Sequence, residues 1–129
     1  MKAGASKKPV RRKYEPTEEP CKKIVKKRSE GKCEICGIRP GQSVHHRRKQ
    51  SQGGPWTPSN CLHLCGDGRG PDGCHGMVTN TRTQYYQYGF LVYSGESWIN
   101  KPVLYRGELV VLDDEGAWTP SLDFGQEAA

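Results

Sequence analysis

Two adjacent histidines, His45 and His46, open the polar stretch HHRRK and could carry acid–base or metal chemistry. Neighbouring residues in a strand point to opposite sides, so the two imidazoles would not readily bind one metal ion together. A division of labour suits them better, with one imidazole as a metal ligand and the other as a proton acceptor near neutral pH. Two more candidates follow, Asn60 at the start of NCLHLC and His75 directly after a cysteine. Taken alone, the histidine pair is more often an ordinary polar pair than a site.

The cysteines predict a second kind of metal site. Cys33 and Cys36 form a C-x-x-C pair in one turn, and Cys65 and Cys74 flank a Gly-rich segment about 30 residues later. Two pairs of thiolates separated in this way are typical of a tetrahedral four-cysteine zinc site, with Zn–S distances of about 2.3 Å. We therefore expect one structural Zn²⁺ on these four residues.

The spacing of the second pair leaves alternatives open. C-x8-C is longer than the usual C-x2-C, although four glycines and a proline between the cysteines make a looped-out segment reasonable. Cys61 is a rival for the fourth ligand place, and His63 is a weaker one. The competing interpretation of the whole set is reduced cysteines without a metal. Cys21 is most simply a core residue on a helix face.

The composition limits the size of the hydrophobic core. The chain has 129 residues, enough for one domain with tails. Only 21 of them are Leu, Ile, Val or Phe, and a structural metal is a usual additional source of stability in so small a chain. There is no apolar run of membrane-spanning length and no signal-peptide core. We expect a soluble, cytoplasmic, monomeric protein without membrane contact.

The charge is concentrated at one end of the chain. The net charge is +6, with 12 Lys/Arg against 4 acidic residues in 1–32 and 2 against 7 in 83–129. A basic first half is typical of proteins that bind a polyanion, most simply nucleic acid. The alternative is a solvated tail that serves only solubility.

Local patterns predict the elements that position these residues. A helix of about three turns should follow an N-cap at Thr17, and a second helix should cover 75–87. QSVHH and NCLHLC should be strands, joined by a Gly/Pro-rich loop. Further strands are expected in YGFLVY, KPVLY and ELVVLD, with a hairpin turn at Arg106-Gly107, and residues after Trp118 should be loose.

Together these motifs resemble the HNH endonuclease family, in its zinc-containing branch. The family has a C-x-x-C pair, a His-His or Asp-His pair, a Gly-Gly turn, an N-L-x-x-L-C strand and a C-H step. Here these read CEIC, VHH, GGPW, NCLHLC and GCHGMVT, over residues 33 to about 80. The whole chain also resembles the small HNH proteins of actinobacterial phages.

The resemblance implies an α+β fold with a small ββα-metal core, in which a hairpin and a helix pack around one divalent ion. The four-cysteine zinc site would staple this core, with an N-terminal helix before it and a β-rich appendage after it. The implied organisation is a disordered basic arm over 1–16, a nuclease domain over 17–87 and an acidic appendage over 88–129.

The resemblance also implies a role for each site residue. His45 takes the first metal-ligand place and His75 the second, His46 takes the place of the general base, and Asn60 that of the asparagine that steadies the loop and the base. Thr79 stands where some members add a third ligand. Two neutral ligands make the site softer than one with a carboxylate, so Zn²⁺, Ni²⁺ or Mn²⁺ should bind more tightly than Mg²⁺.

The implied function is a metal-dependent DNA endonuclease that nicks or cuts with low sequence specificity. His46 would deprotonate the attacking water, and the divalent ion would stabilise the charge at phosphate. Arg47, Arg48 and Lys49 would hold the DNA backbone, the alternative being a solvated loop. By family analogy, the large terminase or portal of a phage packaging complex is a candidate partner, in the host cytoplasm if the chain is phage-encoded.

A non-catalytic function competes with this one. A zinc-stabilised nucleic-acid-binding module or packaging adaptor would explain the basic arm and the four cysteines. It gives no reason for the positions of His45, His46, Asn60 and His75.

Overall fold

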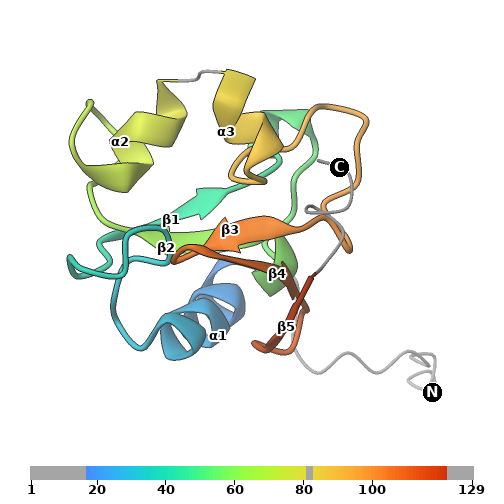
Figure 1. Ribbon diagram of the computed structural model, residues 1–129, viewed down its shortest axis with the longest axis horizontal. Helices are drawn as coiled ribbons and strands as arrows, with labels where there is room; N and C mark the ends of the chain where they lie inside the picture. The colour runs from blue at the N-terminus through green and yellow to red at the C-terminus, as the bar shows by residue number, and fades with distance from the viewer. Residues whose placement is uncertain (1–16, 81–82, 122–129) are drawn as a thin grey trace, which may run out of the picture.

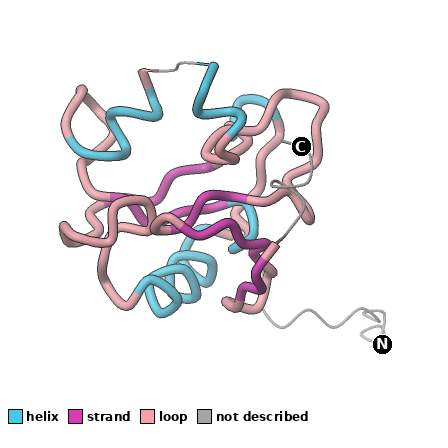
Figure 2. The backbone as a smooth tube through the Cα atoms, in the orientation of Figure 1, coloured by secondary structure: helices cyan, strands magenta, loops and turns pink. Residues whose placement is uncertain are grey.

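The computed structural model describes residues 17–80 and 83–121, which form a small fold of mixed helices and strands (Figure 1). Loops occupy much of the chain between these elements (Figure 2). The expected basic arm over 1–16 lies outside the described residues. In chain order the elements are α1 (Glu18–Ser29), β1 (Ser43–His46), β2 (Cys61–Leu64), α2 (Gly73–Thr79), α3 (Thr83–Gln87), β3 (Val103–Tyr105), β4 (Glu108–Leu112) and β5 (Trp118–Pro120).

β1 and β2 form an antiparallel two-stranded sheet between α1 and α2. His45 pairs with Leu62, and His46 pairs with Cys61. Because side chains alternate along a strand, the two pairs face opposite sides, and Figure 1 shows α1 and α2 on those two sides. Leu62 packs in the cluster that contains Val78 of α2, whereas Cys61 packs against residues of α1. His45 and His46 therefore lie on opposite faces of the hairpin and have different neighbours.

α1 begins where the sequence predicts. Thr17 precedes the helix in an extended conformation, two glutamates stand in its first turn and three basic residues in its last. This distribution of charge is favourable to the helix dipole. Glu30 ends the helix in the left-handed region, with a φ of 56°. Cys21 and Val25, one turn apart, are fully buried against the hairpin, which confirms Cys21 as a core residue.

β3, β4 and β5 form a second antiparallel sheet, in that spatial order. The expected turn at Arg106-Gly107 is confirmed, since both residues have positive φ, 49° and 86°, as a type I′ turn requires. Two expectations are wrong. Residues 119–120 are not loose, because they pair with β4. YGFLVY is not a strand, because its backbone amides bond to the carbonyls of Tyr85 and Arg47 instead of to a neighbouring strand.

The C-terminal sheet shares its core with the hairpin. A three-stranded sheet of this size cannot bury its apolar face alone, and here it packs on β2 and α2. The boundary expected at residue 88 therefore does not separate two cores, and residues 88–121 are part of the same folded unit. The cluster contains Leu62, Leu64, Val78, Phe90, Val103, Tyr105, Val110 and Leu112.

The helix expected over 75–87 is divided. α2 begins earlier, at Gly73, and ends at Thr79, and α3 begins at Thr83. The β-branched residues near the end of α2 lower the helical propensity of this segment. No helix in the described part of the chain is long and apolar enough to cross a membrane.

A buried ion pair joins α1 to both sheets. The guanidinium of Arg28 donates to both carboxylate oxygens of Glu34, at 2.7 and 2.9 Å, and both side chains are at most 1% exposed. Glu34 also accepts from the backbone N–H of His63 at 2.8 Å and from the Tyr105 hydroxyl at 2.6 Å. Arg28 reaches two further carbonyls at the entry to β2, at 2.8 and 2.7 Å. These bonds offset the cost of burying the two charges.

Glu34→Gln should destabilise the fold strongly, because the guanidinium of Arg28 would stay buried without a counter-charge. Removal of one partner of a buried pair costs about 3–5 kcal/mol. Urea unfolding of the zinc-loaded protein measures the change, with the exposed Glu108→Gln as the matched control. Equal midpoints for the two variants would contradict the role given to this pair.

Candidate functional site

The four expected cysteines come together at one end of the hairpin. The Sγ atoms of Cys33, Cys36, Cys65 and Cys74 lie within 4.8 Å of one another. Four sulfurs around one Zn²⁺ at about 2.3 Å are roughly 3.8 Å apart. The cluster therefore has the donors and approximately the size that a zinc ion needs, and it can hold such an ion.

Backbone amides surround the sulfurs of the first pair. The N–H of Ile35 donates to Cys33 Sγ at 3.4 Å, and the N–H of Ile38 donates to Cys36 Sγ at 3.5 Å. Burial opposes ionisation of Cys36, but the N–H groups of Arg39 and Ile38 outweigh it and lower the pKa of this thiol to about 7. Because the thiolate is the metal-binding form, the turn favours the ligand state.

Glycines close the long loop between Cys65 and Cys74. Gly66 and Gly73 have positive φ, 88° and 71°. A Cβ at Gly66 would lie 2.3 Å from the Asp72 carbonyl oxygen, and one at Gly73 would lie 2.6 Å from that of Cys65. Only glycine allows the two ends of the loop to approach so closely. The C-x8-C spacing thus delivers two neighbouring thiols.

The alternative fourth ligands lie elsewhere. Cys61 packs with Cys21 and Val25 on the α1 side of the hairpin. His63 is also on that side, with its Nδ1 2.7 Å from the Ser29 hydroxyl. The fourth member of the cluster is therefore Cys74.

Two of the predicted site histidines meet in a hollow of about 440 Å³ beside the hairpin. The ring centroids of His45 and His75 are 5.3 Å apart. Two imidazoles that share an ion at about 2.1 Å have centroids roughly 5 Å apart, so the pair fits a shared metal ion. His46, Lys49 and Thr79 also line the hollow.

Hydrogen bonds determine which nitrogen of each of these two rings carries the proton. A carbonyl oxygen can only accept, so His45 Nε2 donates to the Phe90 carbonyl at 2.8 Å, and its Nδ1 keeps a lone pair. The Ser43 hydroxyl donates its single hydrogen to the Gly66 carbonyl at 2.6 Å. His75 Nδ1 must then donate to Ser43 Oγ at 2.6 Å, which leaves the lone pair on Nε2. Metal-binding histidines commonly donate their second N–H in this way.

Burial keeps the three histidines of the hollow uncharged. It lowers the pKa of His45 to about 3, that of His46 to about 4, and that of His75 below its ordinary value. The His46 ring lies edge-on to Trp56, with centroids 4.3 Å apart. Its buried Nε2 has no hydrogen-bond partner within the described ranges. A neutral imidazole with an unpaired nitrogen can accept a proton from a bound molecule.

Asn60 holds the loop that leaves β1. Its Oδ1 accepts from the backbone N–H of Arg48 at 2.9 Å, and its Nδ2 donates to the carbonyls of Arg48 and Pro55 at 3.2 and 3.1 Å. The side chain is fully buried. Because Arg48 follows His46 by two residues, this amide constrains the backbone beside His46.

The expectation that Arg47 holds the DNA backbone together with Arg48 and Lys49 is wrong. Its side chain is 1% exposed and donates to three carbonyls, each at 2.8 Å. Burial lowers its pKa to about 9, so it is charged at neutral pH but cannot reach a DNA phosphate. Lys49 is exposed at the hollow, and Arg48 is partly exposed beside it. The carbonyls that Arg47 binds belong to Gly89, Ser59 and Lys101.

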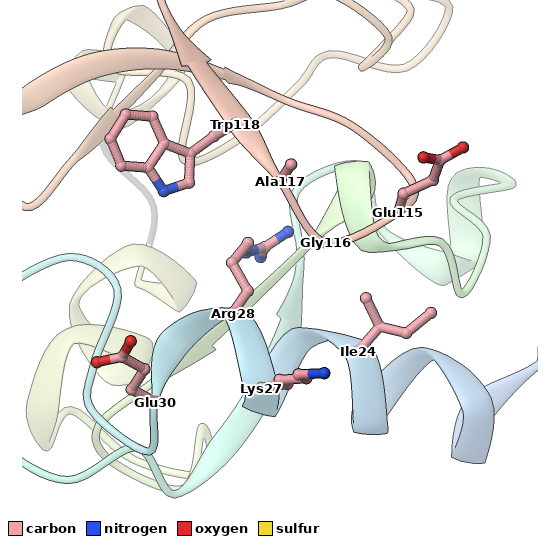
Figure 3. A pocket seen from close by; sticks show the side chains of 8 residues that line it. All are labelled: Ile24, Lys27, Arg28, Glu30, Glu115, Gly116, Ala117 and Trp118. Carbon is pink, nitrogen blue, oxygen red and sulfur yellow. The ribbon is translucent and has the colours of Figure 1, made fainter.

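A larger hollow, of about 580 Å³, lies between α1 and the turn that joins β4 to β5. Figure 3 shows Ile24 and Lys27 on the helix, with Glu115 and Trp118 on the segment that crosses it. Arg28 also lines it, but its guanidinium is paired with Glu34 as described. The lining contains neither histidine nor cysteine among the described residues. The smaller hollow, which the histidines line, is therefore the candidate functional site.

Three contributors to the site are absent from the sequence-based prediction. Ser43 stands two residues before His45, so strand alternation alone could have placed both on one face. Trp56 lies in the expected loop, where no periodicity marks it. The Phe90 carbonyl is 45 residues from His45, and no local pattern indicates this contact.

Comparison of the chain with protein-family models, with curated proteins and with solved structures finds no match.

Cys74→Ser should abolish tight zinc binding, because a hydroxyl does not replace a thiolate ligand, whereas Cys61→Ser should retain zinc. Elemental analysis after purification should give one Zn²⁺ per chain for the wild type and for Cys61→Ser. Strong chelation should unfold both. The opposite pattern, with zinc kept in Cys74→Ser and lost in Cys61→Ser, would contradict the assignment of the fourth ligand.

Proposed function

We propose that this chain is a metal-dependent DNA endonuclease of the HNH type, with a ββα core made of β1, β2 and α2. The observation that carries the proposal is the arrangement of protons around the smaller hollow. Bonds to Phe90 and Ser43 leave one lone pair each on His45 and His75. Beside them, His46 has an unpaired nitrogen. The three neutral imidazoles thus provide two ligands and one base.

His45 and His75 would hold one divalent ion, Mn²⁺, Mg²⁺, Ni²⁺ or Zn²⁺. When bound, the ion would supply positive charge that stabilises a phosphodiester as its P–O bond breaks. Two neutral nitrogen ligands favour the softer members of this set. Ser43 and the Phe90 carbonyl hold the two rings in the ligand tautomer.

His46 would act on the water that attacks the phosphorus. The unprotonated nitrogen of its ring would accept a proton from that water as the new O–P bond forms and the bond to the 3′ oxygen breaks. Burial lowers the pKa of His46 to about 4, so the ring is in the accepting form at neutral pH. Asn60 constrains the backbone behind it, and exposed Lys49 is placed to contact a DNA phosphate.

A zinc-stabilised nucleic-acid-binding or packaging adaptor without catalysis is the competing proposal. The four-cysteine cluster is equally compatible with it. It differs in its expected result, which is binding of DNA that weakens steeply with salt and no cleavage in any divalent ion.

His46→Asn should reduce nicking of supercoiled plasmid by a factor on the order of 10²–10⁴, because the general base is lost. His63→Asn is the matched control, since His63 does not line the hollow and its Nδ1 lies against the Ser29 hydroxyl. Gel electrophoresis in Mn²⁺, Mg²⁺ and Ni²⁺ measures the rates, and thermal unfolding checks both folds. Equal nicking by wild type and His46→Asn would exclude His46 as the base.

Ser43→Ala should weaken binding of the divalent ion about 10- to 100-fold, because His75 loses the acceptor that orients it. Nicking should recover at higher metal concentration, and the zinc content should not change. Ser51→Ala, at an exposed serine in the segment that follows β1, is the control. An unchanged metal dependence in Ser43→Ala would show that this hydroxyl does not orient a ligand.

A further inference from the structure

Two tyrosines stack on each other in the segment that follows α2. Tyr86 of α3 and Tyr93 stack face to face, with centroids 3.9 Å apart and planes 7° from parallel. Tyr93 is 50% exposed. Because Tyr86 covers one face of its ring, the exposed area includes the other face. An open, flat aromatic face is the feature on which a nucleobase stacks, whatever its sequence.

The turn that carries Tyr93 is held in place. Glu96 accepts from the Tyr93 backbone N–H at 3.1 Å, and its own N–H donates to the Tyr93 carbonyl at 2.9 Å. The second carboxylate oxygen of Glu96 pairs with Lys101 at 2.8 Å. The ring is therefore presented by an ordered turn, and the nearby carboxylate is neutralised, so it does not repel a phosphate backbone.

Two cations lie near the hollow. Lys49 is exposed and lines it. Arg48, the residue before it, is partly exposed, and its guanidinium is 5.7 Å from the centroid of the Trp98 ring, which is a cation–π contact. Both cations can attract a nucleic-acid backbone to this part of the surface.

The stacked pair is within reach of the hollow. Leu91 lines the hollow, and Tyr93 follows it by two residues, which span at most about 7 Å. The backbone N–H of Val92 donates to the Arg47 carbonyl at 2.9 Å, which ties this segment to the end of β1. The backbone of Tyr93 therefore lies close to the hollow.

We propose that Tyr93, backed by Tyr86, is a stacking platform for an unpaired nucleobase next to the scissile phosphate. A base in a continuous duplex is covered by its neighbours and cannot stack on this ring. The substrate class is therefore DNA with unpaired bases beside the cut, such as a single strand, a flap or a gap. This inference rests on the proposed nuclease chemistry of the hollow.

The test is DNA binding by the full chain with its zinc and without added divalent ion. Fluorescence anisotropy compares a labelled 12-nucleotide single strand with the duplex of the same sequence. Stacking of one base contributes about 1–3 kcal/mol, which corresponds to about 5- to 150-fold in Kd. Tyr93→Ala should raise the Kd for the single strand at least fivefold and that for the duplex less than twofold. Tyr93→Phe, which keeps the ring, should stay within twofold of wild type.

Trp118→Ala is the matched control, because Trp118 is a partly exposed aromatic residue on β5, away from α3 (Figure 1). It should leave both Kd values within twofold. A rise below fivefold in Tyr93→Ala, an equal rise for single strand and duplex, or no single-strand binding by wild type would overturn the platform. Cleavage of the plasmid and of the labelled single strand by the same preparations tests the nuclease separately. Cleavage without the Tyr93 effect removes only the platform, whereas the Tyr93 effect without cleavage of either DNA removes the nuclease and leaves a platform that only binds single strands.

Discussion

The carboxylate of Glu34 is the point on which the rest of the fold depends. It lies between Cys33 and Cys36, so the turn that supplies two thiols of the four-cysteine cluster also supplies the only partner of the buried Arg28 guanidinium among the described acidic side chains. From this position it binds α1, β2 and β3 at once. Because neither charge is tolerated alone in the interior, the helix, the cysteine turn and both sheets must be in place together. The buried ion pair thus makes the folding of these elements cooperative in a chain that has few large aliphatic residues.

The two faces of the hairpin carry different side chains of the candidate site. Ser43 and His45 face α2, and His46 faces Trp56 on the other side. The next residue, Arg47, bonds to the carbonyls of loops on the C-terminal side and draws the 89–92 segment against β1. This segment brings the Phe90 carbonyl to His45, and thereby sets its tautomer. A structural arginine and the C-terminal half of the fold thus take part in building the site.

In the smaller hollow the uncharged imidazoles are buried, whereas the positive charge of Lys49 is exposed. Burial removes the charge from the imidazoles, and an uncharged imidazole is the form that binds a metal ion or accepts a proton. The exposed cation of Lys49 stands at the rim, where it can meet a phosphate without lying against the buried rings. Arg48, which precedes Lys49 in the chain, is partly exposed and adds a second cation to this loop.

The sequence by itself determined the features that local spacing controls. These are α1, the two short strands and the turn at Arg106-Gly107, since periodicity and turn chemistry act over a few residues. The pairing pattern of the cysteines also indicated which four of them come together. Only the tertiary structure decided between Cys74 and Cys61, assigned Arg47 to the interior and joined the C-terminal sheet to the hairpin. It also decided the protonation of His45, through a carbonyl 45 residues away. Such outcomes depend on which buried polar groups find partners across distant segments, and a partner of that kind leaves no mark in local sequence.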